Sequence, residues 1–488
     1  MKIFNLYTKQ EFYYTKLLFQ RSLAFIYFIA FLILFNQGKA LIGSHGLTPA
    51  NLFIERSHFW DAPSLFFLNS SDATLTLFSC LGIIISLLGM MGITERFGHF
   101  VSIGSWFILW LVYLSFVSIG QVWYAFAWES LLLETGFLAI FLGPRKISPP
   151  RIIIWALRWV CFRNIFGSGM IKLRGDQCWK DLTCLFVYYE TQPIPNPLSP
   201  LFHALPKFIH KASVLWTFIV ELIMPFAMLT PWGLLCALAG IVMIIFQGLI
   251  IVSGNLSWFN YLSIVLVIPC FNDEFIKKVF PFTRKDVLTQ PIPTLHQWST
   301  YLLGALILWR SWGPVANLLS SRQVMNRSFD RLRLVNTYGA FGTITKKRNE
   351  LVILGTQDHD PSNAKWLAYE FKGKPTNPQR MPSIMGPYEW KLDWQLWFAA
   401  FGHHKYSPWT LNLVAKLLSA QPEILNLLAQ DPFHGQKPKW IKIDYYNYTF
   451  KKLNESGVWQ RVYLDQWLPP LNLEHPQFVK ILKTNKWL

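Results

Sequence analysis

Charged residues are scarce in this chain. They account for 15% of its 488 residues, whereas about a quarter of the residues are charged in an average soluble domain. Hydrophobic residues account for 52% of the chain and aromatic residues for 17%. A chain with so few charges is not an ordinary soluble enzyme, and its composition predicts an integral membrane protein with several spans.

Three kinds of functional motif are absent from the sequence. No serine lies in a Gly-x-Ser-x-Gly elbow, so the chain is not itself an ordinary lipase. No nucleic-acid-binding motif accompanies the net charge of +18, so the basic excess indicates membrane topology and anionic lipids. Asp358-His359-Asp360 and His403-His404 lack metal-site spacing and are typical of turns or surfaces. We therefore predict membrane lipids as partners, no nucleic acid, and neither a metal nor a cofactor.

Cysteine is also rare, with six residues in the chain and none after Cys270. Cys178 and Cys184 share one polar loop and could form a disulfide on an oxidising face of the membrane. Because spacing along the chain does not fix side-chain geometry, two free thiols remain the alternative. The other four lie in apolar segments, where cysteine is typically a small buried hydrophobe, and they are Cys80, Cys161, Cys236 and Cys270.

Long apolar runs fill the first two thirds of the chain. They predict an α-helical bundle of about eight to nine transmembrane helices, in a membrane domain that covers residues 1–316. The first sixteen residues are polar and basic and the first run is long enough to span, so we expect a retained first helix and no cleaved signal peptide. The predicted spans are residues 17–35, 74–91, 100–119, 121–142, 152–173, 214–230, 232–252, 256–271 and 298–312.

Lysine and arginine in the short loops predict the orientation of the chain. With a cytosolic N-terminus and nine spans, a long loop at 174–211 and everything after about Gly313 lie on the non-cytosolic side. The run at 256–271 is short, and if it does not span, the C-terminal part changes sides. The basic residues on the predicted cytosolic side are Lys2, Lys9, Lys16, Arg96, Arg145, Lys146, Arg151, Lys277, Lys278, Arg284 and Lys285.

After Asn317 the long apolar runs stop and polar alternation begins. Residues 326–488 contain 22 Lys and Arg against 13 Asp and Glu, and a domain of this length can bury its own core. Short runs separated by turn residues predict a soluble α+β domain, β-sandwich-like, with a helical insertion. The predicted strands are residues 331–335, 350–354, 365–371, 439–451 and 459–464, and the predicted helices are residues 392–401, 409–418 and 423–429.

Five of the charged side chains inside the predicted spans are candidates for buried ion pairs. Charges within a bilayer are costly and usually pair inside a bundle. Two carboxylates on one span and two guanidiniums on the next share a five-residue spacing, which predicts two ion pairs between these helices. A buried network that fixes the bundle is one interpretation, and a site for a substrate or a lipid headgroup is the other. The five residues are Glu129, Glu134, Arg158, Arg163 and Glu221.

The stretch from Phe166 to Pro200 joins a predicted span to a polar, aromatic loop. Gly167-Ser168-Gly169 would let another backbone pack closely, and Lys172 follows near the outer end of the span. Four prolines between residues 193 and 200 favour extended, ordered backbone, so we predict a site at the membrane surface. Lys172 either extends to the interface or acts as an activated amine, which would require its burial.

This stretch resembles the lipase maturation factor family. A block with this order of polar and proline residues rarely arises by chance, and further matches occur in the right order in both halves of the chain. In the central stretch the matches are Gly167-Ser168-Gly169 with Lys172 and Leu173, Trp179 to Thr183, and Tyr189-Glu190-Thr191-Gln192-Pro193 with Pro195. Elsewhere they include Leu131-Leu132-Leu133-Glu134, Val335-Asn336-Thr337-Tyr338-Gly339, Tyr369-Glu370-Phe371-Lys372, Leu392-Asp393-Trp394-Gln395 and Asp431-Pro432-Phe433.

The resemblance implies a membrane factor that helps secreted lipases, or other exported proteins, reach their active form by holding the client on its C-terminal domain. It implies the membrane of the endoplasmic reticulum, or the inner membrane in a bacterium, and a binding role rather than an enzymatic one. The sequence does not fix the oligomeric state. A folding factor predicts an exposed apolar or aromatic face within residues 326–488.

The family is also distantly similar to the membrane domain of the vitamin K-dependent carboxylase. There, a lysine in a Gly-x-x-Lys-Leu context acts as a base, and Lys172 matches it. The alternative function is therefore a membrane enzyme with a site near Lys172. That alternative predicts a cavity between helices that reaches Lys172 and Glu134.

Overall fold

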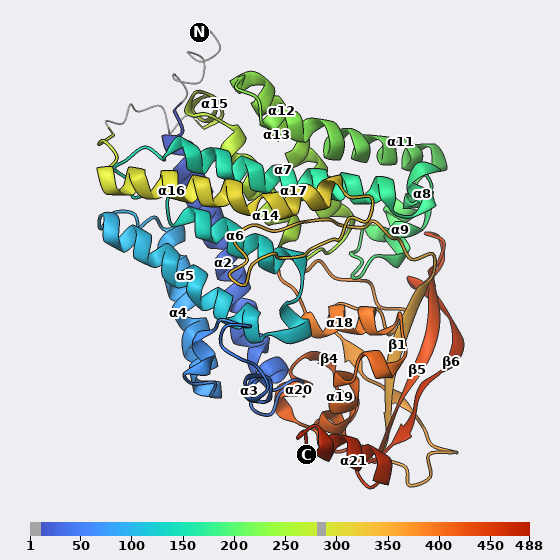
Figure 1. Ribbon diagram of the computed structural model, residues 1–488. Helices are drawn as coiled ribbons and strands as arrows, with labels where there is room; N and C mark the ends of the chain where they lie inside the picture. The colour runs from blue at the N-terminus through green and yellow to red at the C-terminus, as the bar shows by residue number, and fades with distance from the viewer. Residues whose placement is uncertain (1–10, 281–288) are drawn as a thin grey trace.

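The computed structural model describes residues 11–280 and 289–488. Its N-terminal region is helical, and the strands all belong to the part after residue 320 (Figure 1). In Figure 1 the helices coloured from blue to yellow form one body, and the red strands β5 and β6 lie at the lower right edge. The two parts share buried contacts, among them a hydrogen bond from Gln37 to the Glu389 carbonyl.

The first described helix, α2 (Tyr13–Ile42), runs through the helical region. At 1.5 Å per residue its 30 residues are about 45 Å long, enough to cross a bilayer. The Asp273 carboxylate accepts hydrogen bonds of 2.8 Å from the backbone N–H groups of Tyr13 and Tyr14, which satisfies donors at the helix start. α4 (Asp72–Met90) packs along α2, where Gly82 leaves room for the ring of Phe31.

Six helices in the described ranges are long and apolar enough to cross a membrane, and a bent helix pair gives a seventh span if it is counted as one. The bent pair, Phe259–Cys270 with Asp273–Val279, turns through 114°. The predicted count of eight to nine spans is therefore not confirmed. The six helices are Tyr13–Ile42, Asp72–Met90, His99–Ile119, Lys207–Met228, Gly233–Ser253 and Thr294–Leu319.

The difference in count comes from α6 (Ala127–Ala139) and α7 (Arg151–Arg174). α6 has only 13 residues, about 20 Å of helix, which is too short to cross a bilayer alone. α7 has 24 residues, but three of them, Arg158, Arg163 and Lys172, are buried cations. Both helices pack inside the helical region, against each other and against α14.

Shorter elements complete the helical region. α11 and α12 are continuous through a π-helical turn at Ile219–Ile223. Turns of 3₁₀-helix lie at Leu65–Phe67, Gln121–Tyr124 and Ile268–Cys270. The remaining helices are α3 (Ala50–Glu55), α5 (His99–Ile119), α11 (Lys207–Phe218), α12 (Met224–Met228), α13 (Gly233–Ser253), α14 (Phe259–Val267), α15 (Asp273–Val279), α16 (Thr294–Arg310) and α17 (Trp312–Leu319).

The central loop, residues 174–211, contains three short helices, but residues 192–198, which hold three of its four closely spaced prolines, are not helical. Three short helices follow one another: α8 (Gln177–Lys180), α9 (Leu185–Thr191) and α10 (Ser199–His203). The prolines lie at helix boundaries, because Pro193 follows the end of α9 and Pro200 lies in the first turn of α10.

The segment between α17 and the first strand crosses the helical region as irregular chain. Residues 331–335, predicted as a strand, contain no strand, and only an isolated bridge joins Ser328 and Asn336. The segment instead bonds to the bundle. The Asp176 backbone N–H donates to the Gly342 carbonyl at 2.9 Å, and the Asp176 carboxylate accepts from the Ile344 N–H at 2.7 Å. Neighbours on the bundle therefore determined its conformation.

The strands form one antiparallel sheet of four, in the order β2-β1-β5-β6, and a separate pair, β3 with β4. A β-sandwich is not confirmed, because helices pack against this sheet: α18 (Lys391–Ala399) on β1 and α19 (Trp409–Leu418) on β5. The strand bounds are β1 (Arg348–Thr356), β2 (Leu367–Ala368), β3 (Glu370–Phe371), β4 (Leu428–Gln430), β5 (Trp440–Phe450) and β6 (Trp459–Leu471).

Alternation along β1 separates two apolar clusters. Leu351 and Ile353 join the main core, whereas Val352 packs with Tyr448 and Trp459 on the other face. One prediction near the end of the chain was wrong, because the predicted helix at 423–429 is the four-residue α20 (Pro422–Leu425) followed by β4. The last helix, α21 (Pro476–Thr484), was not predicted.

Candidate functional site

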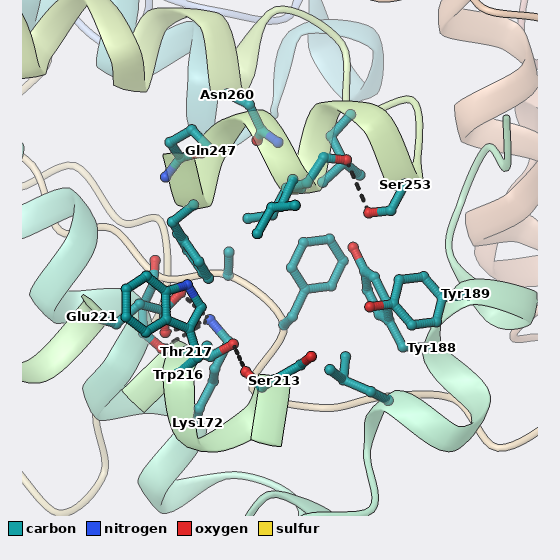
Figure 2. Close-up of a pocket in the computed structure, with 18 of the residues that line it drawn as sticks. Lys172, Tyr188, Tyr189, Ser213, Trp216, Thr217, Glu221, Gln247, Ser253 and Asn260 are labelled. Atoms are coloured by element: carbon teal, nitrogen blue, oxygen red, sulfur yellow. Dashed lines mark hydrogen bonds and ion pairs between the residues drawn. The ribbon is translucent and has the colours of Figure 1, made fainter. Parts of the chain in front are cut away.

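A cavity of about 300 Å³ lies between α7, α9, α11, α13 and α14. We call it the lateral cavity. Most of its wall is aromatic or aliphatic, and the remainder is polar (Figure 2). Its lining includes Lys172 and Glu221, but Glu134 is not among the described residues that line it. The enzyme interpretation predicted a cavity that reaches both Lys172 and Glu134, and the lateral cavity reaches only Lys172 of these two.

Lys172 and Glu221 form an ion pair in the cavity wall. The Lys172 Nζ lies 2.7 Å and 2.8 Å from the two Glu221 carboxylate oxygens, and both residues are buried. Nζ also lies 3.4 Å from the Ser168 carbonyl oxygen and 5.5 Å from the centre of the Trp179 ring. Lys172 is therefore held inside the protein and does not extend to the interface.

Small residues on α7 make this pair possible. A Cβ added at Gly169 would lie 2.9 Å from the Glu221 Cβ, so the glycine lets the π-helical turn approach α7. A Cβ added at Gly167 would lie 2.3 Å from the Tyr338 carbonyl oxygen, so a second backbone packs against the same helix. The predicted close approach at Gly167-Ser168-Gly169 thus occurs on two sides.

Glu134 is the centre of a separate buried cluster. Its carboxylate pairs with the Arg163 guanidinium and accepts a hydrogen bond of 2.6 Å from the Tyr338 hydroxyl. It also accepts from the backbone N–H and the side-chain amide of Asn336, at 3.1 Å and 3.0 Å. Arg163 in turn donates to the Asn336 carbonyl at 2.6 Å. The cluster joins α6 and α7 to the segment that leads into the sheet.

Glu129 pairs with the C-terminal part and not with Arg158, which corrects the predicted second ion pair. The Lys391 Nζ lies 2.5 Å from the Glu129 carboxylate and 3.0 Å from that of Glu389, and all three are buried. Arg158 donates to the Pro269 carbonyl at 3.0 Å. Five residues turn a helix by about 140°, so Arg158 and Arg163 face different neighbours.

The central loop residues that match the family contact the sheet. Arg348 on β1 donates to the carbonyl oxygens of Glu190, Gln192 and Pro193. The Phe450 N–H donates to the Glu190 carboxylate at 2.7 Å, and burial raises the pKa of that carboxyl above its ordinary value. The loop and the C-terminal part thus form one hydrogen-bonded unit.

The same loop also walls the lateral cavity. Tyr189 lines the cavity, and its ring centre lies 5.5 Å from that of Phe202. Trp179 lines it as well, and its indole N–H donates to the Phe341 carbonyl at 2.9 Å. The Gln192 amide donates to the Ser253 carbonyl at 2.9 Å, which ties the loop to the end of α13.

Cys178 and Cys184 are joined by a disulfide, with their Cα atoms 4.8 Å apart. It closes the turn between α8 and α9, next to Trp179 in the cavity wall. Cys161, Cys236 and Cys270 are buried free thiols in apolar surroundings. In residues 11–280 and 289–488, no group of three or more His, Cys, Asp or Glu side chains is arranged to hold a metal ion.

Sequence reasoning missed several residues that complete these clusters. Arg348, Glu350 and Lys374 form a fully buried charged group, with Glu350 3.1 Å from Lys374. Charges at alternate positions of the apolar run 348–356 were the available signal. Lys391 stands one residue before a predicted helix, and nothing in its local pattern indicates a partner on α6.

Residues 14–278 match the profile of the lipase maturation factor transmembrane domain, and residues 334–469 match that of the lipase maturation factor C-terminal domain. The chain is 40% identical to mouse (Mus musculus) lipase maturation factor 1, over 98% of this chain and 90% of that protein. It is 39% identical to the human (Homo sapiens) protein of the same name, over 95% and 88%. It is 29% identical to lipase maturation factor 2 of Xenopus laevis, over 93% and 82%. No solved structure matches the chain.

Proposed function

The chain belongs to the lipase maturation factor family, and we propose that it matures secreted lipases or other exported clients by holding them on its C-terminal part. It is a multi-pass membrane protein. The class of client is inferred from the name of the family, and the binding surface is proposed to lie within residues 326–488. One strand carries this proposal.

That strand is β6, an edge of the four-stranded sheet. It has 13 residues and pairs with β5 along one side only, among the described residues. Residues 460–466 are exposed, and Val462, Tyr463 and Leu464 are 56%, 53% and 47% exposed. Natural proteins usually protect such edges, because an unpaired row of N–H and C=O groups binds another extended chain. An incompletely folded client offers extended segments that can add to β6 as a further strand.

Replacing Val462, Tyr463 and Leu464 together with threonine is expected to lower the yield of active secreted lipase at least about tenfold, since truncated contact residues at a binding centre cost about 2 kcal/mol or more. Threonine retains strand preference, so the sheet should persist. The assay uses cells that lack their own maturation factor and express the full chain with a secreted lipase. Active lipase in the medium is measured at matched expression of both proteins.

Leu453→Thr is the matched control, because Leu453 is 60% exposed in the turn between β5 and β6. This variant should support normal lipase yields. Equal yields from the triple variant, at an unchanged thermal midpoint, would overturn the proposed client edge.

An enzyme acting through Lys172 is the second candidate, favoured by the cavity that reaches this amine. A Lys172→Met, Glu221→Met double variant removes both charges without leaving either one buried alone. Under the binding proposal this folded variant still matures lipase. Complete loss of maturation, with client binding retained, would favour the enzyme.

We also propose that the N-terminus is cytosolic and that the C-terminal part lies in the lumen of the endoplasmic reticulum, or outside the inner membrane in a bacterium. The loops that hold Arg96, Arg145 and Lys146 gather at the start of α2. There the Lys16 Nζ bonds to the Pro144 carbonyl at 2.7 Å, and the Arg145 N–H bonds to the Glu95 carbonyl at 3.1 Å.

The other end of α2 contacts the C-terminal part through Gln37, so the basic loops and the sheet lie at opposite ends of a helix long enough to cross the membrane. The disulfide in the central loop also suits an oxidising compartment. Lys2, Lys9, Arg284 and Lys285, which the sequence also placed in the cytosol, lie outside the described residues.

A phosphatase that folds only in an oxidising compartment should be active when it is fused after Leu488. The same reporter inserted after Lys146 should be inactive, because that loop lies at the basic end of the bundle. A fluorescent reporter confined to the cytosol is fused at both positions in parallel. Activity of the cytosolic reporter alone after Leu488 would reject this orientation.

A further inference from the structure

Three buried amides line the lateral cavity without complete hydrogen bonding. Asn164 Oδ1, Gln247 Oε1 and Asn260 Nδ2 have no hydrogen-bond partner in the part of the chain that the structure describes. They come from three helices, α7, α13 and α14, and all three side chains are at least 95% buried. Leaving such groups unsatisfied costs free energy, so a cluster of them in a cavity wall indicates a bound polar group.

The position of these amides is fixed by their neighbours. Asn164 donates its Nδ2 to the Ser263 hydroxyl at 3.0 Å, which leaves Oδ1 as the unpaired atom. Ser263 and Asn260 lie one turn apart on α14, so Asn164 and Asn260 meet at the same level of the bundle. Figure 2 shows Asn260 beside Gln247, at the opposite side of the pocket from Lys172 and Glu221. Together the amides offer both acceptor and donor atoms.

The charge of the cavity favours a neutral ligand. Its one buried cation, Lys172, is compensated by Glu221 through two short contacts, so the pair adds no net charge. A charged headgroup would have to lose its hydration without gaining an opposite charge. A hydroxyl group and an ester carbonyl, in contrast, match the donor and acceptor atoms of the amides.

The rest of the wall matches an acyl chain. Phe202, Leu205, Ile209, Trp216, Phe246 and Ile250 form an apolar surface that water would not satisfy. The cavity lining includes residues of α11 and of the C-terminal half of α13, and one of them, Leu249, is 48% exposed, so we place the mouth of the cavity between these two helices. α12, which continues α11, packs against the N-terminal half of α13, so α11 and the C-terminal half of α13 diverge toward the mouth of the cavity. Because both helices are candidate membrane spans, the mouth opens toward the bilayer.

We propose that the lateral cavity binds a neutral acylglycerol from the bilayer. One acyl chain occupies the apolar wall, and the hydroxyl and ester groups bond to Asn164, Gln247 and Asn260. A volume of about 300 Å³ is at the small end of ligand sites, which suits one chain with the rest of the molecule in the membrane. This site is independent of client binding at β6.

Labelling with a photoactivatable lipid tests the site. The full chain is reconstituted in bilayer discs that contain diacylglycerol with a diazirine on its acyl chain, and labelled peptides are mapped by mass spectrometry. Peptides from α11, α13 and α14 should carry the label. A Gln247→Leu, Asn260→Leu double variant should lose labelling about 25-fold, since each of the two lost hydrogen bonds weakens binding by roughly a factor of five. Its thermal midpoint should not fall, because unpaired polar groups are replaced by apolar ones of similar shape.

A second variant acts on the wall and leaves the amides intact. Ser213→Phe places a ring at the cavity wall on α11 and should also lower labelling, whereas Leu238→Phe, on the exposed face of α13, should not. Phosphatidylcholine with the same diazirine chain should label the cavity peptides several-fold less than diacylglycerol. The proposal is overturned if no lipid labels these peptides, which is the result for a cavity that holds only water, or if both lipids label them equally in the wild type and in the leucine variant.

Discussion

Replacing Glu134 with alanine is expected to lower the free energy of unfolding by about 3–5 kcal/mol. The carboxylate is buried and accepts hydrogen bonds from Arg163, from the hydroxyl of Tyr338 and from two N–H groups of Asn336. Its removal leaves a buried guanidinium without a counter-charge and leaves the other donors without that acceptor. Removing one partner of a buried ion pair destabilises a protein far more than replacing both partners with apolar residues, because the charge that remains is buried and cannot reach water.

Thermal and denaturant unfolding of the purified protein measure this effect. Glu134→Gln keeps one acceptor oxygen and should lose less stability than Glu134→Ala. Glu274→Ala is the matched control, since Glu274 forms an exposed ion pair with Lys278 within α15 and should change little. If Glu134→Ala unfolded at the same midpoint as the control, the cluster would not be a support of the fold.

Lys391→Met is expected to cause a loss of similar size, about 3–5 kcal/mol, by another route. Lys391 lies between two buried carboxylates, Glu129 on α6 and Glu389 beside its own helix. Without the ammonium group, two like charges face each other in a dry site. The damage should concentrate where the C-terminal part meets the bundle, so trypsin should cut more quickly between residues 320 and 347.

The loss should depend on pH. Burial already raises the pKa of Glu389 above its ordinary value in the wild type, and the variant also loses the Lys391 charge, which lowers that pKa, so the folded variant binds a proton more readily than the unfolded chain does. The variant should therefore be closest to the wild type at low pH and should lose stability as pH rises through the folded-state pKa. Lys405→Met, at an exposed position, is the control. A pH-independent difference between Lys391→Met and the wild type would contradict this assignment of the charges.

The spacing of apolar and polar residues along the chain predicted many of the helices and strands well. It predicted poorly which elements pack against one another. β1, β5 and α19 lie close to where alternation and apolar spacing placed them. Residues 331–335 have strand-like composition but no neighbouring strand, and the backbone N–H groups of Leu334 and Val335 donate to the Asp330 carboxylate in the same segment instead. The number of spans differed for another reason, because α6 has only 13 residues and α7 carries three buried cations.

The candidate site shows the same limit. Glu129, Glu134, Arg163 and Glu221 were identified as paired because charges in a membrane seldom stand alone. A pair between the two helices, such as the one that joins Glu134 to Arg163, was predicted. The partners Lys391 of Glu129 and Asn336 of Glu134 were not identified, since they are 262 and 202 residues away along the chain. The lateral cavity exists because α11 and α13 diverge, and the separation between these two helices could not be predicted from any pattern in the sequence.

The long separation between these partners sets an order for biosynthesis. Glu129 enters the membrane while Lys391, 262 residues later, is still untranslated. At about 5–20 residues per second, α6 waits roughly 13–50 s for its counter-charge. During that interval the nascent bundle carries exposed acidic positions that insertion and quality-control factors can recognise. A chain that stops before residue 336 never closes the Glu134 cluster, so truncation should direct the membrane region itself to degradation rather than leave a stable bundle without its C-terminal part.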